Sequence, residues 1–319
     1  MPQPVLYSLG SINADFQVRI DRPPDTGQTL VGADFVRLGG GKAANVALLA
    51  QRLGAQARLL GHVGEDALAE QALGTLREAG IDLAGVAAVS GADTAVSMIA
   101  VLPDGRKSIV LANNANDLWQ EGDARHVAGL IAEAPAGSLL VADYEVPRFV
   151  VKAAVDAAAA RGLPIVIDPS PAGRVDLGVL ARAAAVTPNP TEAEGLTGIA
   201  VAGPEDAVAA ADWLVARHVP AVCLKLAKGG CVVAEGRRKW TIAPVSVPVV
   251  DTTGAGDAFA GGLAVALMEG RPLIEAAAFA VAASHLAVTA YGSQPAYPAR
   301  RHVQDLLPRI KAKISPLAG

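Results

Sequence analysis

Residues 251–262 read DTTGAGDAFAGG and open a long run of small and apolar residues that predicts a helix. The first N–H groups of a helix have no partner within it, and glycine lets a ligand approach the backbone closely. The start of this helix therefore favours an anion. Asp257, one turn into the helix, would lie beside that anion, so the layout favours phosphoryl transfer with Asp257 accepting a proton. An acid in a first turn can also simply complement the helix dipole.

The composition describes a globular chain with a large core. Hydrophobic residues make up 52% and charged residues 18% of the 319 residues, enough for one large domain with an accessory element or for two domains. The formal charge of −4, without a basic tract, argues against a nucleic-acid surface. The N-terminal stretch has no signal-peptide pattern, and Glu275, Ser284 and His285 interrupt the apolar run 273–290. We expect a soluble, cytoplasmic protein without a membrane span.

Strand and helix patterns alternate along most of the chain. Short apolar runs separated by helical segments are typical of an α/β fold with a largely parallel sheet. The abundance of Ala and Gly predicts closely packed helices. The predicted strands of this series are residues 5–9, 59–63, 138–142, 163–167, 184–187 and 222–226, and its first helices are residues 42–53 and 65–79.

Two hairpin-like pieces, residues 16–38 and 94–111, interrupt that alternation. Apolar residues at 16, 18 and 20 alternate with polar ones, which predicts a strand with one solvent-facing side. The two pieces can pair into a small separate sheet over one end of the main domain. Such a sheet exposes edges and an apolar face, which proteins usually cover. We therefore expect a homodimer formed through this sheet.

A glycine-rich segment, residues 39–45 (GGGKAAN), opens the first long helix. It is not a P-loop, because Ala43 rather than Ser or Thr follows the lysine. Lys42 and Asn45 are three residues apart and share a helical face. Together with Asn13 and Asp15 they could bind a polyhydroxylated ligand. Taken singly, each of these residues also fits a turn, a cap or a solvated surface.

Four segments together resemble the PfkB family of carbohydrate kinases. They are residues 9–15 (LGSINAD), 40–45 (GGKAAN), 187–194 (TPNPTEAE) and 251–262, and the resemblance covers nearly the entire chain. It implies a ribokinase-like α/β fold, Rossmann-like, with a mostly parallel central sheet flanked by helices and a small β-sheet lid. The kinase domain would comprise residues 1–14, 39–93 and 112–319, and the inserted lid residues 15–38 and 94–111.

The resemblance also implies an activity: transfer of the ATP γ-phosphate to a sugar hydroxyl. Asp257 would be the base, and the backbone of residues 253–256 would form an anion hole for the transferring group. The implied catalytic residues are Asp257, Gly254, Ala255 and Gly256. D-ribose, giving ribose 5-phosphate, is the leading substrate. Fructose, 2-keto-3-deoxygluconate and nucleosides remain alternatives, as does a sugar-binding sensor without catalytic activity.

Binding residues follow from the same resemblance. The implied sugar contacts are Asn13, Asp15, Gly41, Lys42, Asn45, Glu145 and Asp257. The implied nucleotide contacts are Asn189, Glu192, Lys225, Ala227, Gly230, Gly254 and Gly256, with Glu192 also holding Mg²⁺ through water. An activating K⁺ or another monovalent cation would lie at Asp251, Thr253, Ala287, Ala290 and Gly292.

Some positions depart from the family pattern. Lys225 stands where Thr is frequent, and Ala227 where Gly is found. A lysine there can contact phosphates, or it can reach from the strand end to solvent. Ala43 replaces a signature glycine, and Ala296 stands where a serine ligand of the monovalent cation is usual. These departures concern the nucleotide and the cation more than the transfer chemistry.

Overall fold

The computed structural model describes residues 3–317 and contains a ten-stranded main sheet. From β11 across to β5 neighbouring strands run parallel, and β12, β13 and β14 add an antiparallel edge. In spatial order the strands are β14 (Ile314–Pro316), β13 (Arg238–Ile242), β12 (Cys231–Glu235), β11 (Ala221–Lys225), β10 (Ala185–Val186), β9 (Ile165–Asp168), β8 (Leu139–Asp143), β1 (Val5–Leu9), β4 (Gln56–Gly64) and β5 (Asp82–Val89).

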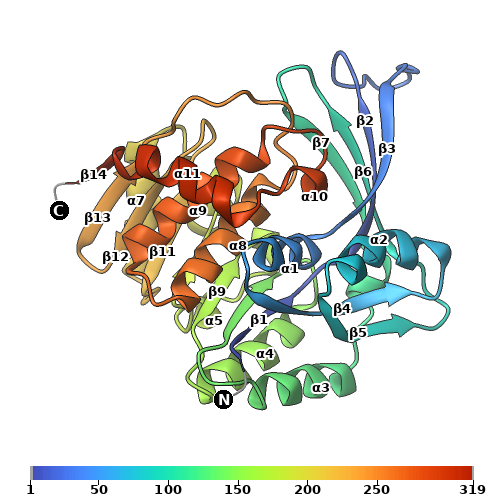
Figure 1. The fold of residues 1–319 in the computed structure, drawn as a ribbon, viewed down its shortest axis with the longest axis horizontal. Coiled ribbons are helices and arrows are strands. Elements are labelled where there is room, and N and C mark those ends of the chain that lie inside the picture. The colour runs from blue at the N-terminus through green and yellow to red at the C-terminus, as the bar shows by residue number, and fades with distance from the viewer. Residues whose placement is uncertain (1–2, 318–319) are drawn as a thin grey trace.

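Helices cover both faces of this sheet and form two outer layers (Figure 1). One layer contains α1 (Lys42–Arg52), α2 (Ala67–Glu78), α8 (Ala255–Met268), α9 (Leu273–Ala287) and α11 (Arg300–Lys311). The other contains α3 (Glu121–Ala132), α4 (Arg148–Ala160), α5 (Leu177–Leu180), α6 (Pro190–Thr197) and α7 (Pro204–Val215). Short turns of helix are η1 (Asn114–Asp117), η2 (Ala172–Arg174) and α10 (Ser293–Ala296). The predicted α/β class is confirmed.

Two apolar cores lie on opposite sides of the main sheet. Along β8, Leu139 and Val141 pack into one core, and Leu140 packs into the other. Both faces are covered, so the strands read as continuous apolar runs rather than alternating ones. Helices α8 and α9 pack in close contact, because a Cβ added at Gly262 of α8 would lie 3.1 Å from the Cα of Ala280 in α9. The Ala- and Gly-rich composition thus produces the close helix packing that it predicts.

The two hairpin-like pieces form a second, four-stranded sheet, as predicted (Figure 1, upper right). Its order is β3 (Ala33–Gly40), β2 (Asn13–Arg19), β6 (Ala95–Val101) and β7 (Lys107–Ala112). β2 pairs antiparallel with β3 and parallel with β6, and β6 pairs antiparallel with β7. Asn13 of β2, Ser97 of β6 and Lys107 of β7 from this mixed sheet line one side of a large cavity, which is described below.

The expectation of a solvent-facing polar side on β2 is wrong. Asp15 and Gln17 are buried, whereas Phe16 and Val18 on the other side are only half-buried. Gln17 is buried because its amide donates to the Asp251 carboxylate, 2.7 Å between Nε2 and Oδ2. The polar side of the strand therefore faces the main body, and the apolar side faces outward.

Other differences concern sheet edges and element ends. β5 and the antiparallel strands β13 and β14 were not predicted. The predicted helix 65–79 begins later, because Asp66 caps α2 by accepting a hydrogen bond from Ala69 N. The first two and last two residues of the predicted kinase domain lie outside the described residues. Among residues 3–317, no helix is both long and apolar enough to cross a membrane.

Candidate active site

A cavity of about 860 Å³ lies between the second sheet, the carboxyl ends of the parallel strands and the start of α8. The predicted site residues that line it are Asn13, Asp15, Gly41, Lys42, Asn45, Glu145, Asn189, Glu192, Lys225, Ala227, Gly230, Thr253, Gly254, Ala255, Gly256 and Asp257. Segments far apart in the chain therefore meet around one space. Four predicted residues, Asp251, Ala287, Ala290 and Gly292, lie outside its lining.

The start of α8 opens directly onto the cavity. Gly254 precedes the helix with a φ of 74°, a left-handed conformation that favours glycine. A Cβ at this position would lie 2.5 Å from Tyr297 Oη and 2.6 Å from Ser293 Cβ. No side chain within residues 3–317 caps the helix. Ala255 N donates to Thr252 O at 3.3 Å, so the rest of the first turn is what the helix start offers to an anion.

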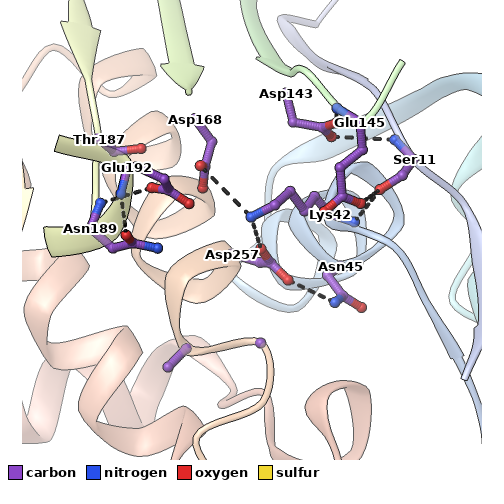
Figure 2. Close-up of polar contacts among 12 residues, drawn as sticks. Ser11, Lys42, Asn45, Asp143, Glu145, Asp168, Thr187, Asn189, Glu192 and Asp257 are labelled. Atoms are coloured by element: carbon purple, nitrogen blue, oxygen red, sulfur yellow. Dashed lines mark hydrogen bonds and ion pairs between the residues drawn. The ribbon is translucent and has the colours of Figure 1, made fainter. Parts of the chain in front are cut away.

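Asp257 is buried in the first turn of α8 and contacts two residues of α1 (Figure 2). Asn45 Nδ2 donates to Asp257 Oδ2 at 2.8 Å, and Lys42 Nζ lies 3.7 Å from Asp257 Oδ1. Lys42 and Asn45 thus share a helical face, as predicted. Burial disfavours the Lys42 charge, but the carboxylates of Asp168, Asp257 and Glu145 outweigh it, and the pKa of Lys42 lies well above its usual value.

The second sheet contributes a polar chain and an unpaired acid. Asn116 Nδ2 donates to Asn13 Oδ1 at 2.8 Å, and Asn13 Nδ2 donates to Ser97 Oγ at 3.0 Å. Asp15 is buried, and within residues 3–317 its Oδ1 has no hydrogen-bond partner. Burial, with the charges of Asp257 and Glu145, raises the pKa of Asp15 to about 7. An unsatisfied buried carboxylate oxygen in a cavity wall suits a hydroxyl donor.

A pair of acidic residues, Asp143 and Glu145, lies at the carboxyl end of β8. Ser11 Oγ donates to Glu145 Oε2 at 2.6 Å, and Asp143 accepts from Glu145 N at 2.8 Å and from Ser11 N at 3.3 Å (Figure 2). Burial and the neighbouring Glu145 charge raise the pKa of Asp143 well above its usual value. Burial also raises the pKa of Glu145, against the opposing effects of Lys42 and Ser11. Asp143 therefore positions the loop that carries Glu145.

The opposite end of the cavity is built around the start of α6. Asn189 and Glu192 form a reciprocal cap, in which Glu192 N donates to Asn189 Oδ1 and Asn189 N donates to Glu192 Oε2, each at 2.8 Å. Lys225, at the end of β11, lies 3.3 Å from Asp168 Oδ2 and 4.0 Å from Glu192 Oε2. Its side chain is 12% exposed. The alternative of a lysine that reaches to solvent is therefore wrong.

Asp251, four residues before α8, lies outside the lining of the cavity. It is fully buried, and its Oδ1 accepts from Thr253 N at 2.8 Å and from Thr253 Oγ1 at 2.7 Å. Its Oδ2 accepts from Gly292 N at 2.9 Å and from Gln17 Nε2. The carboxylate thus ties together three segments. No group of three or more His, Cys, Asp or Glu side chains within residues 3–317 is arranged to hold a metal ion.

Comparison with known proteins identifies the family of this chain. The model of the pfkB family carbohydrate kinases matches residues 4–300. The chain belongs to this family. It is 34% identical to a ribokinase of Haemophilus influenzae over 95% of this chain and 98% of the relative, and 31% identical to one of Bacillus subtilis over 94% and 98%. The structure of Arabidopsis thaliana ribokinase complexed with ribose and ATP superposes with a TM-score of 0.81 at 30% identity, covering 96% of this chain and 99% of that one.

The pfkB family assignment accounts for the four signature segments and the ribokinase-like fold. Several residues at the site nevertheless belong to none of these segments. Sequence reasoning missed Ser97 and Lys107, which line the cavity, and Asp168 and Asn116, which contact the lining residues Lys42 and Asn13. Asp168 ends the parallel strand β9, so its place at the carboxyl edge of the sheet is a signal that could have found it. Lys107 has no such signal, because its place depends on how the second sheet is oriented.

Proposed function

We propose that this chain is an ATP-dependent kinase that converts D-ribose to ribose 5-phosphate. The observation that carries the proposal is Asp257, buried beside the open start of α8 and held by Lys42 and Asn45 in one cavity. The family supports a carbohydrate kinase. Ribose is supported by the relatives named ribokinase and by the related structure complexed with ribose and ATP.

In the proposed reaction Asp257 accepts the proton of the sugar hydroxyl. The hydroxyl oxygen bonds to the γ-phosphorus of ATP, and the bond from that phosphorus to the leaving ADP oxygen breaks. The N–H groups of Gly254 and Gly256 stabilise the charge on the transferring group, since Thr253 N and Ala255 N already donate to Asp251 Oδ1 and Thr252 O. Lys42 and Asn45 keep the Asp257 carboxylate facing the acceptor. Asn13, Asp15, Gly41 and Glu145 orient the sugar through its other hydroxyls.

The opposite end of the cavity fits a nucleotide and its magnesium ion. Asn189, Glu192, Lys225, Ala227 and Gly230 line this end, and Gly230 allows a close backbone turn at a φ of 76°. Mg²⁺ commonly keeps several waters and few protein ligands, so contact with Glu192 through water would suffice to hold it. Bound there, Mg²⁺ would offset the negative charge of the phosphates.

We further propose a monovalent-cation site behind the anion hole, at Asp251, Thr253, Ala287, Ala290 and Gly292. The Asp251 carboxylate is engaged by protein donors, so backbone carbonyl oxygens would supply most ligands. Turnover in potassium chloride should exceed turnover in choline chloride at equal ionic strength. Equal rates in the two salts would contradict this site.

We also propose that residues 15–38 and 94–111 act as a lid and pair with a second copy of the chain. Phe16, Met98 and Val110 are in register across three strands on the outward face, and Phe35 stacks on Phe16 with ring centroids 6.3 Å apart. Met98 and Val110 are 54% and 63% exposed. Such an apolar face is normally covered. We place this ATP-consuming activity in the cytoplasm.

A substrate panel tests the proposed function. ADP release is measured with Mg²⁺-ATP and D-ribose, fructose, 2-keto-3-deoxygluconate or a nucleoside, and we expect the highest kcat/KM for D-ribose. A clearly higher kcat/KM for another acceptor would contradict ribose while keeping the kinase. Binding of ribose without ADP release from any acceptor would contradict the kinase and favour a sensor.

A further inference from the structure

Asp168, at the end of β9, lies between two lysines that come from distant parts of the chain. Its Oδ1 is 3.7 Å from Lys42 Nζ, and its Oδ2 is 3.3 Å from Lys225 Nζ. The Asp168 side chain is 4% exposed. Figure 2 shows Asp168 between the Asn189–Glu192 cap and the Lys42–Asp257 pair. One buried carboxylate thus bridges the two ends of the cavity.

Charges of alternating sign extend this bridge in both directions. Lys225 Nζ lies 4.0 Å from Glu192 Oε2, and Lys42 Nζ lies 3.7 Å from Asp257 Oδ1. The order is Glu192, Lys225, Asp168, Lys42 and Asp257, from the nucleotide end to the base. Buried charges are costly unless each is paired, so the position of every member depends on its neighbours. Asp168 is the central member of the line.

Lys225 reaches the start of α8 itself. A Cβ built on Gly256 would lie 3.4 Å from Lys225 Nζ, so the ammonium group faces the first turn of the helix. The start of a helix carries partial positive charge, and a cation beside it is disfavoured. Asp168 and Glu192 offset that repulsion. The Lys225 ammonium group and the backbone N–H groups of the first turn would therefore bind a phosphate together, through charge-assisted hydrogen bonds.

We infer that Asp168 is a positioning residue for phosphoryl transfer, which holds Lys225 at the anion hole as a phosphate ligand and Lys42 beside the base. This inference rests on the proposed kinase function. Asp168 contacts neither substrate in this role, because its effect passes through the two ammonium groups. Lys225 serves the donated phosphate, and Lys42 serves the acceptor side.

Kinetics of Asp168→Asn, Lys225→Met and the double variant test the inference. Loss of one donor to a transition-state oxygen costs about 10²–10³-fold in kcat, which we expect for Lys225→Met, with a raised KM for ATP and unchanged ribose affinity. Asp168→Asn should lower kcat by about 10²-fold, the cost of misplacing a reacting group by about 1 Å. In the Lys225→Met background the same Asp168→Asn change should cost less, because only the contact of Asp168 with Lys42 remains to be lost.

A matched control is Asp156→Asn, which removes a surface carboxylate that also pairs with two cations, Lys152 and Arg182. This variant should keep wild-type kinetics. Additive losses in the double variant would overturn the inference. Near-normal kcat and ATP KM in Lys225→Met would also overturn it, and this second test holds even if Asp168→Asn fails to fold. Asp168→Glu keeps the charge and should restore part of the lost kcat. An inactive wild-type protein would instead contradict the proposed function.

Discussion

One wall of the cavity is built from the main sheet with α1 and α8, and the facing wall is the second sheet. The first wall carries Asp257 and Lys42, and Asp168 pairs with Lys42 and Lys225 next to it, so that each of the three is held by two charged or polar neighbours. The second carries Asp15, with an unpaired oxygen, on a thin sheet whose other face is exposed. From this difference we propose that the first wall carries out the chemistry and that the second serves sugar recognition and assembly.

The largest effect should come from Asp257→Asn, in the first wall. General-base catalysis contributes about 10²–10⁴-fold, so kcat should fall by that amount because no carboxylate takes the hydroxyl proton. The amide keeps the shape and can still contact Asn45, so the dissociation constants of ribose and ATP should change little. Steady-state kinetics and calorimetric titrations measure the two quantities.

Asp305→Asn, an exposed change on α11, serves as the control and should behave like the wild-type protein. Near-normal turnover of Asp257→Asn would show that Asp257 is not the base. The division of roles between the walls would then lose its main support.

A somewhat smaller effect is expected for Gly254→Ala, at the anion hole. The added Cβ would clash with Tyr297 and Ser293, so the loop must shift. Its N–H groups would then no longer point at the transferring group. We expect kcat to fall by about 10²–10³-fold, as for loss of one donor to the transferring group. Kinetics and a thermal melt are measured together.

Gly270→Ala separates this clash from backbone strain. Gly270 has a similar φ of 78°, yet nothing lies within 4 Å of an added Cβ. It should lose only about 1–2 kcal/mol of stability, the cost of a left-handed conformation, and keep its kcat. Equal kinetic losses in both variants would mean that Gly254 has no special role in the anion hole.

Much of the first wall could be predicted from the sequence, because its groups belong to short contiguous motifs. The stretch around Asp257 and the segment with Lys42 and Asn45 each carry their own local signal, and the structure brings them together. Asp168 belongs to no motif, and its importance depends on distances to Lys42 and Lys225 that no local pattern encodes. For the same reason, the sequence alone does not decide whether Lys225 contacts phosphates or reaches to solvent.

The fold shows the same contrast between local and distant information. The buried parallel strands are apolar throughout and could be predicted individually. β13 reads Arg-Lys-Trp-Thr-Ile, and β5 contains Gly85 and exposed positions, so neither has the pattern of a buried strand. On β2 the polar side faces inward to Asp251, a partner far along the chain, and periodicity alone assigned that side to solvent.

In the second wall, Asp15→Asn should change the pH dependence of stability and weaken sugar binding. Asp15 has a pKa of about 7 in the folded protein, against 3.8 as its ordinary value. Between these values the folded state binds the extra proton, so this group costs about 1.4 kcal/mol of stability per pH unit as pH rises. Relative to wild type, the variant should therefore gain stability between pH 5 and pH 7, measured by urea unfolding.

Loss of a charged hydrogen-bond acceptor, worth about 1.5–3 kcal/mol, should also raise the KM for ribose by roughly 10–100-fold with a smaller change in kcat. Asp21→Asn, an exposed change just beyond β2, should alter neither quantity. A kcat loss as large as that of Asp257→Asn would show that the second wall takes part in the chemistry. Parallel stability curves for Asp15→Asn and wild type would contradict the raised pKa.

The smallest effect on turnover should come from Met98→Asp, on the outward face of the second sheet. Its neighbours in register are Phe16 and Val110, so a carboxylate there would be desolvated in a dimer that covers this face. We expect the dimer to weaken by at least tenfold, about 1.4 kcal/mol, in sedimentation velocity. Because Met98 points away from the cavity, kcat should stay within about twofold, as for a surface change. Leu118→Asp, at a site of similar exposure (50%) outside the sheet, should leave association unchanged. If Met98→Asp and wild type associate equally, the outward face is not the dimer contact, and its apolar residues need another explanation.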